Sequence, residues 1–162
     1  MESDSGITRE EVYHDAARHF LDVQISTHNL LDNKSAQIFS VGSVVLPVTF
    51  ALLNLGLTRA PLAAEWALAS ALVFYIILLV CASQASRIRA LEYRPYIPTL
   101  KEHSQNYPST ALKRWVADEY ERSSQENAKV LETKAFWVGI ANHALYLETL
   151  SLSVAAIFTL LL

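Results

Sequence analysis

The sequence predicts an all-α membrane protein with three transmembrane helices, the first and third extending into the cytoplasm as long helices. The 162 residues are 52% apolar and 18% charged, whereas an average soluble domain is about 25% charged. Charged residues are absent from residues 35–58 and 66–86, and residues 135–162 contain only Glu148. Glycine and proline are few, and the alternating apolar pattern typical of strands is missing. Helices are therefore the expected elements.

The three apolar stretches are each long enough to cross a bilayer. They contain 24, 21 and 28 residues, and about 20 residues of helix at 1.5 Å each span a hydrocarbon core about 30 Å thick. The first stretch follows an acidic segment without a basic start, unlike a signal peptide that is cleaved. We therefore expect residues 35–58 to be a retained first span, residues 66–86 a second and residues 135–162 a third.

The basic residues predict the orientation of these spans. Twelve of the 13 lysines and arginines lie before the first span or between the second and third, and only Arg59 lies between the first two. Because basic residues near spans are retained on the cytoplasmic side, residues 1–34 and 87–134 should both be cytoplasmic. Residues 57–65 then form a short outer turn.

The first cytoplasmic segment predicts a long amphipathic helix. Thr8 and Glu11 have the spacing of a capping box, which starts a helix. No glycine or proline interrupts residues 7–41, so one helix is expected to continue from residues 1–34 into the first span. Gly56 should end this helix, and Pro61 should start the next.

The second cytoplasmic segment, residues 87–134, predicts a loop followed by a helix. Pro95, Pro98 and Pro108 exclude one continuous helix. Ser109 or Thr110 is expected to cap a new helix, which continues into the third span. Here Gly139 is only a weak breaker.

An acid, an amide and a base lie directly before the first apolar stretch: Asp32, Asn33 and Lys34. One interpretation is that they mark the water–lipid boundary, where Lys34 reaches phosphate headgroups with its stem in apolar surroundings. The other is that Asp32 and Asn33 face the second cytoplasmic helix and form a polar pocket below the bilayer. Both interpretations stay open at this point.

A second candidate ligand site lies after the second span. An arginine offers donors for a phosphate, and nearby aromatic rings offer planes for a base. These candidates are Arg94 with Tyr93, Tyr96 and Trp115. The alternative, which suits Arg87 and Arg89 better, is that basic residues beside a span contact anionic lipid headgroups.

Polar residues inside the third span form a further group: Asn142, His143 and Glu148. An ionisable group within a bilayer costs at least about 2.5 kcal/mol unless it faces a partner or water. Either the first turns of this span lie in the interfacial region, or Glu148 faces a protein interior.

Catalytic and metal-binding motifs are missing, so we expect neither an enzyme nor a cofactor. Asp15, His19 and Asp22 share a helical stripe, but such spacing is also common among solvated pairs, and we expect no metal site. The basic residues are too dispersed to suggest a nucleic-acid partner. Small residues in the first two spans favour close helix contacts, and we expect a homo-oligomer embedded in the lipid bilayer.

The segment HNLLDNKSAQIFSVGSVVLPV, residues 28–48, resembles the small transmembrane effectors of bacterial Pycsar antiphage systems. A polar helix carries Asp32 and Lys34 into the first span, a second span follows closely, and a charged helix leads into a third span at the C-terminus. Two-span SLATT effectors share this theme. Asp32 and Lys34 are the only positions that match the motif, and no cyclic-nucleotide-binding β-barrel is recognisable.

The resemblance implies an antiviral effector in the bacterial inner membrane. A partner nucleotide cyclase would make a cyclic pyrimidine nucleotide, cUMP or cCMP, on infection. The effector would respond by impairing membrane integrity and causing abortive infection. Two alternatives are a membrane scaffold without a ligand, and a small channel or transporter subunit in which Glu148 is the working residue.

Overall fold

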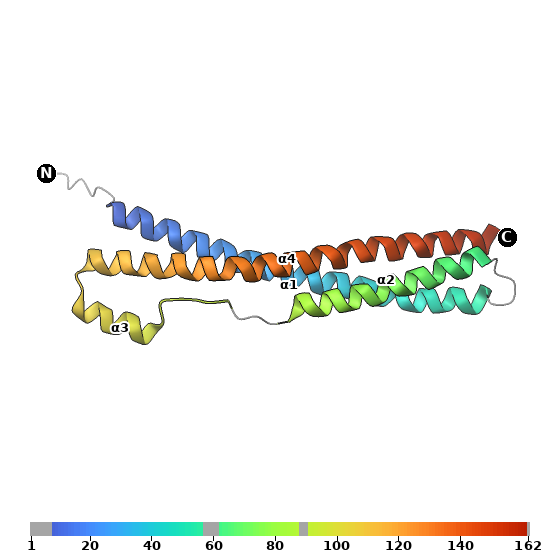
Figure 1. The fold of residues 1–162 in the computed structure, drawn as a ribbon, viewed down its shortest axis with the longest axis horizontal. Coiled ribbons are helices and arrows are strands. Elements are labelled where there is room, and N and C mark those ends of the chain that lie inside the picture. Colours follow the sequence, from blue (N-terminus) through green and yellow to red (C-terminus); the bar gives the residue numbers. More distant parts are fainter. Residues whose placement is uncertain (1–7, 57–61, 88–90, 162) are drawn as a thin grey trace. The chain divides into compact units, whose positions relative to one another are not determined.

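The computed structural model describes residues 8–56, 62–87 and 91–161, apart from some side chains near the ends of the first and last helices. Within these residues it has four helices and no strand (Figure 1). They are α1 (Arg9–Gly56), α2 (Leu62–Ser86), α3 (Ile97–Asn106) and α4 (Ser109–Leu161). The predicted all-α class is confirmed.

Helix α1 starts at the predicted capping box and is one continuous helix of 48 residues. The Thr8 amide N–H donates to the Glu11 carboxylate over 3.1 Å, and the Glu11 amide N–H donates to the Thr8 hydroxyl over 3.3 Å. These two bonds satisfy backbone donors that a helix start leaves without partners. Helix α1 is described as far as Gly56, and because residues 57–61 lie outside the described residues, the end of this helix at Gly56 stays a prediction. Pro61 lies outside the described residues.

The prolines of residues 87–134 exclude one continuous helix there, as predicted, but they also flank a short helix that was not predicted. Helix α3 has Pro98 in its first turn, where a missing N–H costs nothing. Helix α4 starts at Ser109 itself, and the Leu112 amide N–H donates to the Pro108 carbonyl over 3.0 Å. The predicted cap at Ser109 or Thr110 is therefore too late by at least one residue. The continuation of α4 without a break to Leu161 is confirmed.

The chain divides into two compact units. The first, Met1–Asn29 with Arg89–Glu132, contains the start of α1, all of α3 and the start of α4, and is called the polar unit below. The second, Leu30–Ile88 with Thr133–Leu162, contains the rest of α1 and α4 with α2, and is called the apolar unit.

The apolar unit packs its three helices around two clusters of buried side chains. One cluster surrounds Leu78 and the other surrounds Leu68 and Leu152. Alanines and Gly42 allow close approach: a Cβ added at Gly42 would lie 3.1 Å from a methyl group of Leu78. This is the small-residue packing that helices use in lipid.

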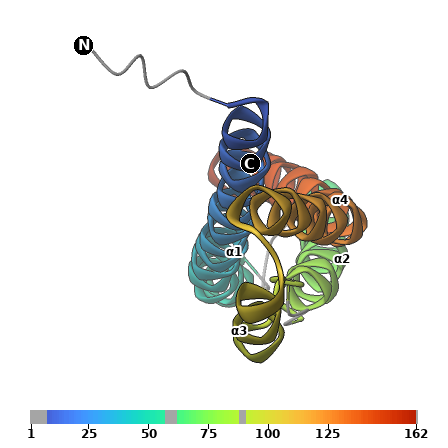
Figure 2. The same ribbon diagram turned by 90° about the vertical axis from the view of Figure 1, so that its left-hand side faces the viewer.

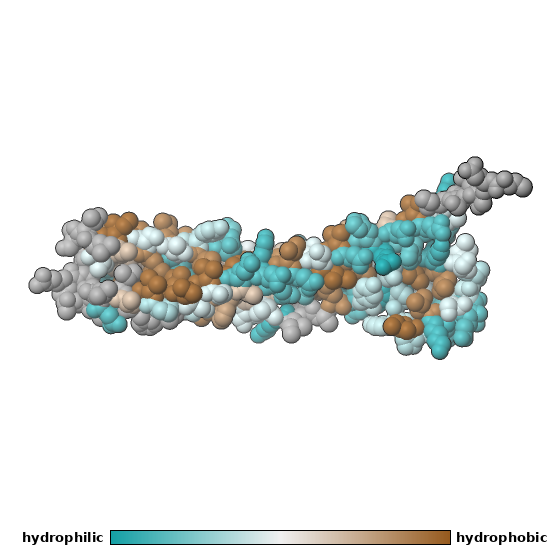
Figure 3. Space-filling view, turned by 180° about the vertical axis from the view of Figure 1, so that it is seen from behind, coloured by the Kyte–Doolittle hydropathy of each residue, from teal (hydrophilic) through white to brown (hydrophobic). Residues whose placement is uncertain are grey.

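Many large apolar side chains of the apolar unit face outward, among them Val44, Trp66, Ile76 and Leu150. Brown apolar surface accordingly gathers over this unit in Figure 3. Two helices in the described residues are long and apolar enough to cross a membrane, α2 and the stretch Ser109–Thr159 of α4. This finding indicates a membrane-associated helical protein. Helix α1 is not one of the two, so the predicted set of three spans stays a prediction.

The polar unit has a mixed interior. Leu21, Val116 and Ala117 are buried together with polar side chains, which are Gln24, Ser123, Ser124 and Asn127. The chain turns from α3 into the start of α4 (Figure 2). The rings of His103 on α3 and Trp115 on α4 are in contact, with centroids 4.2 Å apart. Buried polar groups need partners, and these partners define the candidate sites below.

Candidate functional site

Asp32 forms an ion pair with Lys134 of α4 inside the apolar unit. The Asp32 Oδ1 and Lys134 Nζ atoms are 2.6 Å apart, and the Lys134 side chain is 6% exposed while that of Asp32 is 44% exposed. The last acid before the first apolar stretch of α1 therefore meets the last base before the apolar stretch of α4. In the sequence, Lys134 stood out only as one of the basic residues that indicate the orientation of the spans.

Asn33 and Lys34 do not share this contact, because both are exposed. Of the two interpretations of the Asp32–Asn33–Lys34 group, a polar contact with the second long helix applies to Asp32 only. Lys34 lines a different groove of about 500 Å³, together with Asn142 and Tyr146 of α4. A lysine, an amide and a tyrosine are typical of the water–lipid interface.

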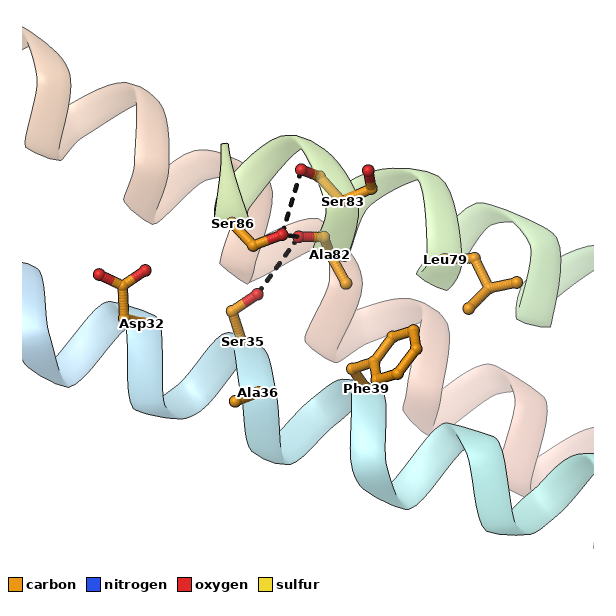
Figure 4. Close-up of a pocket in the computed structure, with 8 residues that line it drawn as sticks. All are labelled: Asp32, Ser35, Ala36, Phe39, Leu79, Ala82, Ser83 and Ser86. Atoms are coloured by element: carbon orange, nitrogen blue, oxygen red, sulfur yellow. Dashed lines mark hydrogen bonds between the residues drawn. The ribbon is translucent and has the colours of Figure 1, made fainter. Parts of the chain in front are cut away.

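A groove of about 390 Å³ between α1 and α2 lies beside Asp32. It is lined at one end by Asp32, Ser35 and Ser86, and further along by Phe39 and Leu79 (Figure 4). The hydroxyl of Ser35 donates to the Ala82 carbonyl over 3.3 Å, and that of Ser86 donates to the same carbonyl over 2.8 Å. Both hydroxyls therefore bond to the backbone of α2, and Asp32 is the one ionisable residue among those that line this groove.

Glu148 lies inside the apolar unit. Its side chain is 1% exposed, and its Oε2 atom has no hydrogen-bond partner among the described residues. Ala144 and Leu152, one turn away on either side, belong to the two apolar clusters. Of the two open alternatives for Glu148, the structure supports the protein interior.

The other polar residues of the third predicted span have different surroundings. His143 is exposed, and its Nδ1 lies 2.8 Å from the Gly139 carbonyl of the preceding turn. Asn142 is half-buried and lines the groove with Lys34. Asn142, His143 and Glu148 therefore do not form one joint site.

In the polar unit, Arg94 is held by two carboxylates. Its Nη2 atom lies 3.3 Å from Glu126 Oε2, and its Nε atom lies 3.7 Å from Glu92 Oε2. The guanidinium charge is already balanced by this arrangement. A phosphate at Arg94 would have to displace at least one carboxylate.

The aromatic residues predicted to accompany Arg94 face different neighbours. The Tyr93 ring is 6.3 Å from that of Tyr120, and the Tyr96 hydroxyl donates to Glu92 over 3.3 Å. The Trp115 ring contacts that of His103 at an angle of 46°. Tyr93 and Tyr96 are exposed. The structure thus brings Arg94 and Tyr96 to one carboxylate but places Trp115 against α3.

Asn127 and Ser123 anchor the chain between α2 and α3 on α4. The Glu92 amide N–H donates to the Asn127 side-chain carbonyl over 2.8 Å, and the Asn127 amide N–H donates to the Glu92 carbonyl over 2.9 Å. The Arg94 amide N–H donates to the Ser123 hydroxyl over 3.1 Å. These residues were not predicted as site residues. The pattern that could have indicated them is a Ser-Ser pair and an Asn on the otherwise apolar face of a helix.

Side-chain bonds also join α1 and α4 directly in the polar unit. Lys113 pairs with Glu11, and the Tyr13 hydroxyl lies 3.1 Å from Asp118 and 2.7 Å from Glu121. The bond from Lys113 holds the pKa of Glu11 below its usual value of 4.5. The bond to Glu121, with burial, raises the pKa of Tyr13. The start of α1 is thereby fixed on α4 by charged groups.

In the part of the chain that the structure describes, no group of three or more His, Cys, Asp or Glu side chains is placed to hold a metal ion. Asp22, one of the three residues with metal-compatible spacing, lies 3.9 Å from Arg18 of the same helix. His14 rather than His19 lies beside Asp15, at 3.2 Å.

Comparison with protein families, with curated proteins and with solved structures found no significant match. Function is therefore inferred from the residues of this chain and from the resemblance of residues 28–48.

Proposed function

We propose that this protein is an antiviral defence effector, anchored by three spans in a bacterial inner membrane, that responds to a cyclic pyrimidine nucleotide by impairing membrane integrity. One observation carries the proposal most: α1 and α4 each belong both to a polar unit held by charged side chains and to an apolar unit with outward-facing apolar residues. A partner nucleotide cyclase would supply cUMP or cCMP, as the resemblance implies. The N-terminus and residues 87–134 would face the cytoplasm.

The first of the three proposed spans is the second half of α1. Residues 35–58 contain no charged side chain, and the α1 residues Ile38 and Gly42 pack against Leu78 of α2. A helix packed between two membrane-crossing helices shares their lipid surroundings. This packing supports three spans, assembled as a homo-oligomer through the outward-facing apolar residues.

The proposed response is a shift between two arrangements of α1 and α4. A ligand shifts such an equilibrium only if it binds one arrangement better than the other. The side-chain bonds between the start of α1 and the start of α4 are the contacts that a bound ligand would strengthen or break.

Calorimetry on the detergent-solubilised protein, with cUMP, cCMP and cyclic GMP as ligands, tests the sensing step. We expect heat of binding with at least one pyrimidine nucleotide and a weaker signal with the purine. Depolarisation of cells that express the protein with a nucleotide cyclase, compared with cells that express either alone, tests the membrane step. Absence of binding to both pyrimidine nucleotides would remove the sensing half of the proposal.

A second candidate function is a small cation-conducting assembly, which the burial of Glu148 favours. A carboxyl group that is 1% exposed, with one oxygen lacking a partner among the described residues, is an expected feature of an ion pathway. Replacing Glu148→Gln should abolish conductance in planar bilayers if this function is correct. The control is Glu65→Gln, an exposed acid in α2, which should leave conductance unchanged.

A further inference from the structure

We infer that the polar unit carries an anion site at Arg9 and Arg114, which takes the phosphate of a small phosphate-bearing ligand. The two arginines come from the first turn of α1 and the second turn of α4 and line one cavity of about 240 Å³ with Glu10, Tyr13 and Asp118. Neither the sequence pattern nor the resemblance singled out these residues. That the ligand is a cyclic nucleotide depends on the proposed function, whereas the anion site does not.

Both guanidinium groups are available. Arg9 and Arg114 have no hydrogen-bond or ion-pair partner among the residues that the structure describes, in contrast to Arg94, which two carboxylates hold. Guanidinium groups bind phosphate oxygens in a bidentate manner. Two of them from separate helices can hold one phosphate between them.

The contacts around the cavity keep its walls in place. Lys113 pairs with Glu11, and Tyr13 donates to Asp118 and Glu121. These bonds fix the first turns of α1 against α4, so the helix positions that carry the two arginines are set before a ligand arrives. Preorganisation of this kind lowers the entropy cost of binding.

The two carboxylates in the cavity make the site selective. The Tyr13 hydroxyl already occupies one oxygen of Asp118, while Glu10 has no partner among the described residues. A bare phosphate meets two cations and two anions and gains little net Coulomb energy. A ligand that also offers N–H or O–H donors gains hydrogen bonds to Glu10. A nucleotide, with a hydroxyl and base N–H groups beside its phosphate, therefore suits the cavity better than inorganic phosphate.

The cavity is smaller than the roughly 300 Å³ at which pockets for drug-sized ligands begin. It suits a phosphate group with the attached sugar edge, while the remainder of the ligand stays outside. A ligand in this position contacts both long helices near their first turns. Its binding energy would therefore depend on how α1 and α4 pack within the polar unit, as the proposed response requires.

The test measures binding to the full chain in phosphatidylcholine nanodiscs, using cUMP, cCMP and inorganic phosphate as probes. Arg9→Gln and Arg114→Gln should each lower nucleotide affinity by about tenfold, and the double variant should show no measurable binding. Arg114→Lys should lose most of the affinity, because an ammonium cannot bind in a bidentate manner. The matched control is Arg122→Gln, an exposed arginine of α4 that does not line the cavity. Unchanged helix content by circular dichroism shows that each variant is folded.

Unchanged nucleotide affinity in the double variant would overturn the inference, and so would wild-type protein that binds neither nucleotide. If cells that express the Arg9→Gln, Arg114→Gln double variant still depolarise only in the presence of nucleotide, the proposed function stands without the anion site. If the site binds nucleotide but no depolarisation follows, the inference stands and the proposed function fails. Repeating the measurement in phosphatidylglycerol nanodiscs tests the lipid as the phosphate source. Loss of nucleotide binding there would assign the cavity to headgroups and overturn the inference.

Discussion

Removing either member of the Asp32–Lys134 pair should destabilise the apolar unit by very different amounts. The pair is asymmetric, because the Lys134 side chain is 6% exposed and that of Asp32 is 44% exposed. Removing one partner of a fully buried pair costs about 3 to 5 kcal/mol, since the remaining charge stays buried without compensation. An exposed pair contributes about 0 to 1 kcal/mol. The cost of each substitution depends on the charge that it leaves behind.

Asp32→Asn removes the carboxylate that lies 2.6 Å from the buried ammonium of Lys134, so we expect a loss of about 2 to 4 kcal/mol in the free energy of unfolding. Lys134→Met leaves a half-exposed carboxylate and keeps an apolar stem of similar length, so about 1 kcal/mol or less is expected. The double variant Asp32→Asn with Lys134→Met should be more stable than Asp32→Asn alone, because no buried charge remains.

Equilibrium unfolding in mixed detergent micelles, followed by tryptophan fluorescence, measures these differences. The matched control is Asp22→Asn, whose partner Arg18 lies 3.9 Å away with both side chains more than half exposed; its effect should stay within about 0.5 kcal/mol. A larger loss for Lys134→Met than for Asp32→Asn would refute the reasoning. So would additive losses in the double variant.

Two further predictions concern helix contacts within each unit. An alanine methyl at Gly42 would lie 3.1 and 3.2 Å from the two methyl carbons of Leu78, whereas one at Gly139 meets nothing within 4 Å. The unfolding experiment should therefore find Gly42→Ala less stable than Gly139→Ala by about 1 kcal/mol or more. Equal stabilities would contradict the packing. The pKa of Glu11 is lowered in the folded chain by its bond to Lys113, so its contribution to stability is complete above its unfolded pKa near 4.5 and is lost as the pH falls through the lowered folded value. Acid titration of the unfolding midpoint should show a loss below about pH 5 that is smaller in Glu11→Gln, and identical profiles would contradict it.

The parts of the fold that depend on local sequence were predictable. The capping box at Thr8 and Glu11 follows from residues close together in the chain. Helix α3 was missed because the three prolines of residues 87–134 were considered only as helix breakers. Pro98 could have indicated a helix start, since proline suits the first turn.

The site contacts were less predictable, because they join distant residues. Asp32 meets Lys134, and Asn127 meets Glu92, only once the helices pack. Arg94 appeared available because its basic charge was considered without its acidic surroundings. Glu92 was visible two positions away, but the approach of Glu126 required the fold.

The pair of hydrogen bonds between the Asn127 side chain and the backbone of Glu92 restricts which residues can occupy position 127. The backbone of Glu92 offers an N–H donor and a carbonyl acceptor. The carboxamide of Asn127 accepts from the first and donates to the second, as the backbone of a neighbouring strand does in a sheet. An aspartate has the same shape but only accepts when ionised, and a glutamine would place its amide one methylene further from α4. Among close relatives of this chain, asparagine should therefore persist here while its exposed neighbours Gln125 and Ala128 vary.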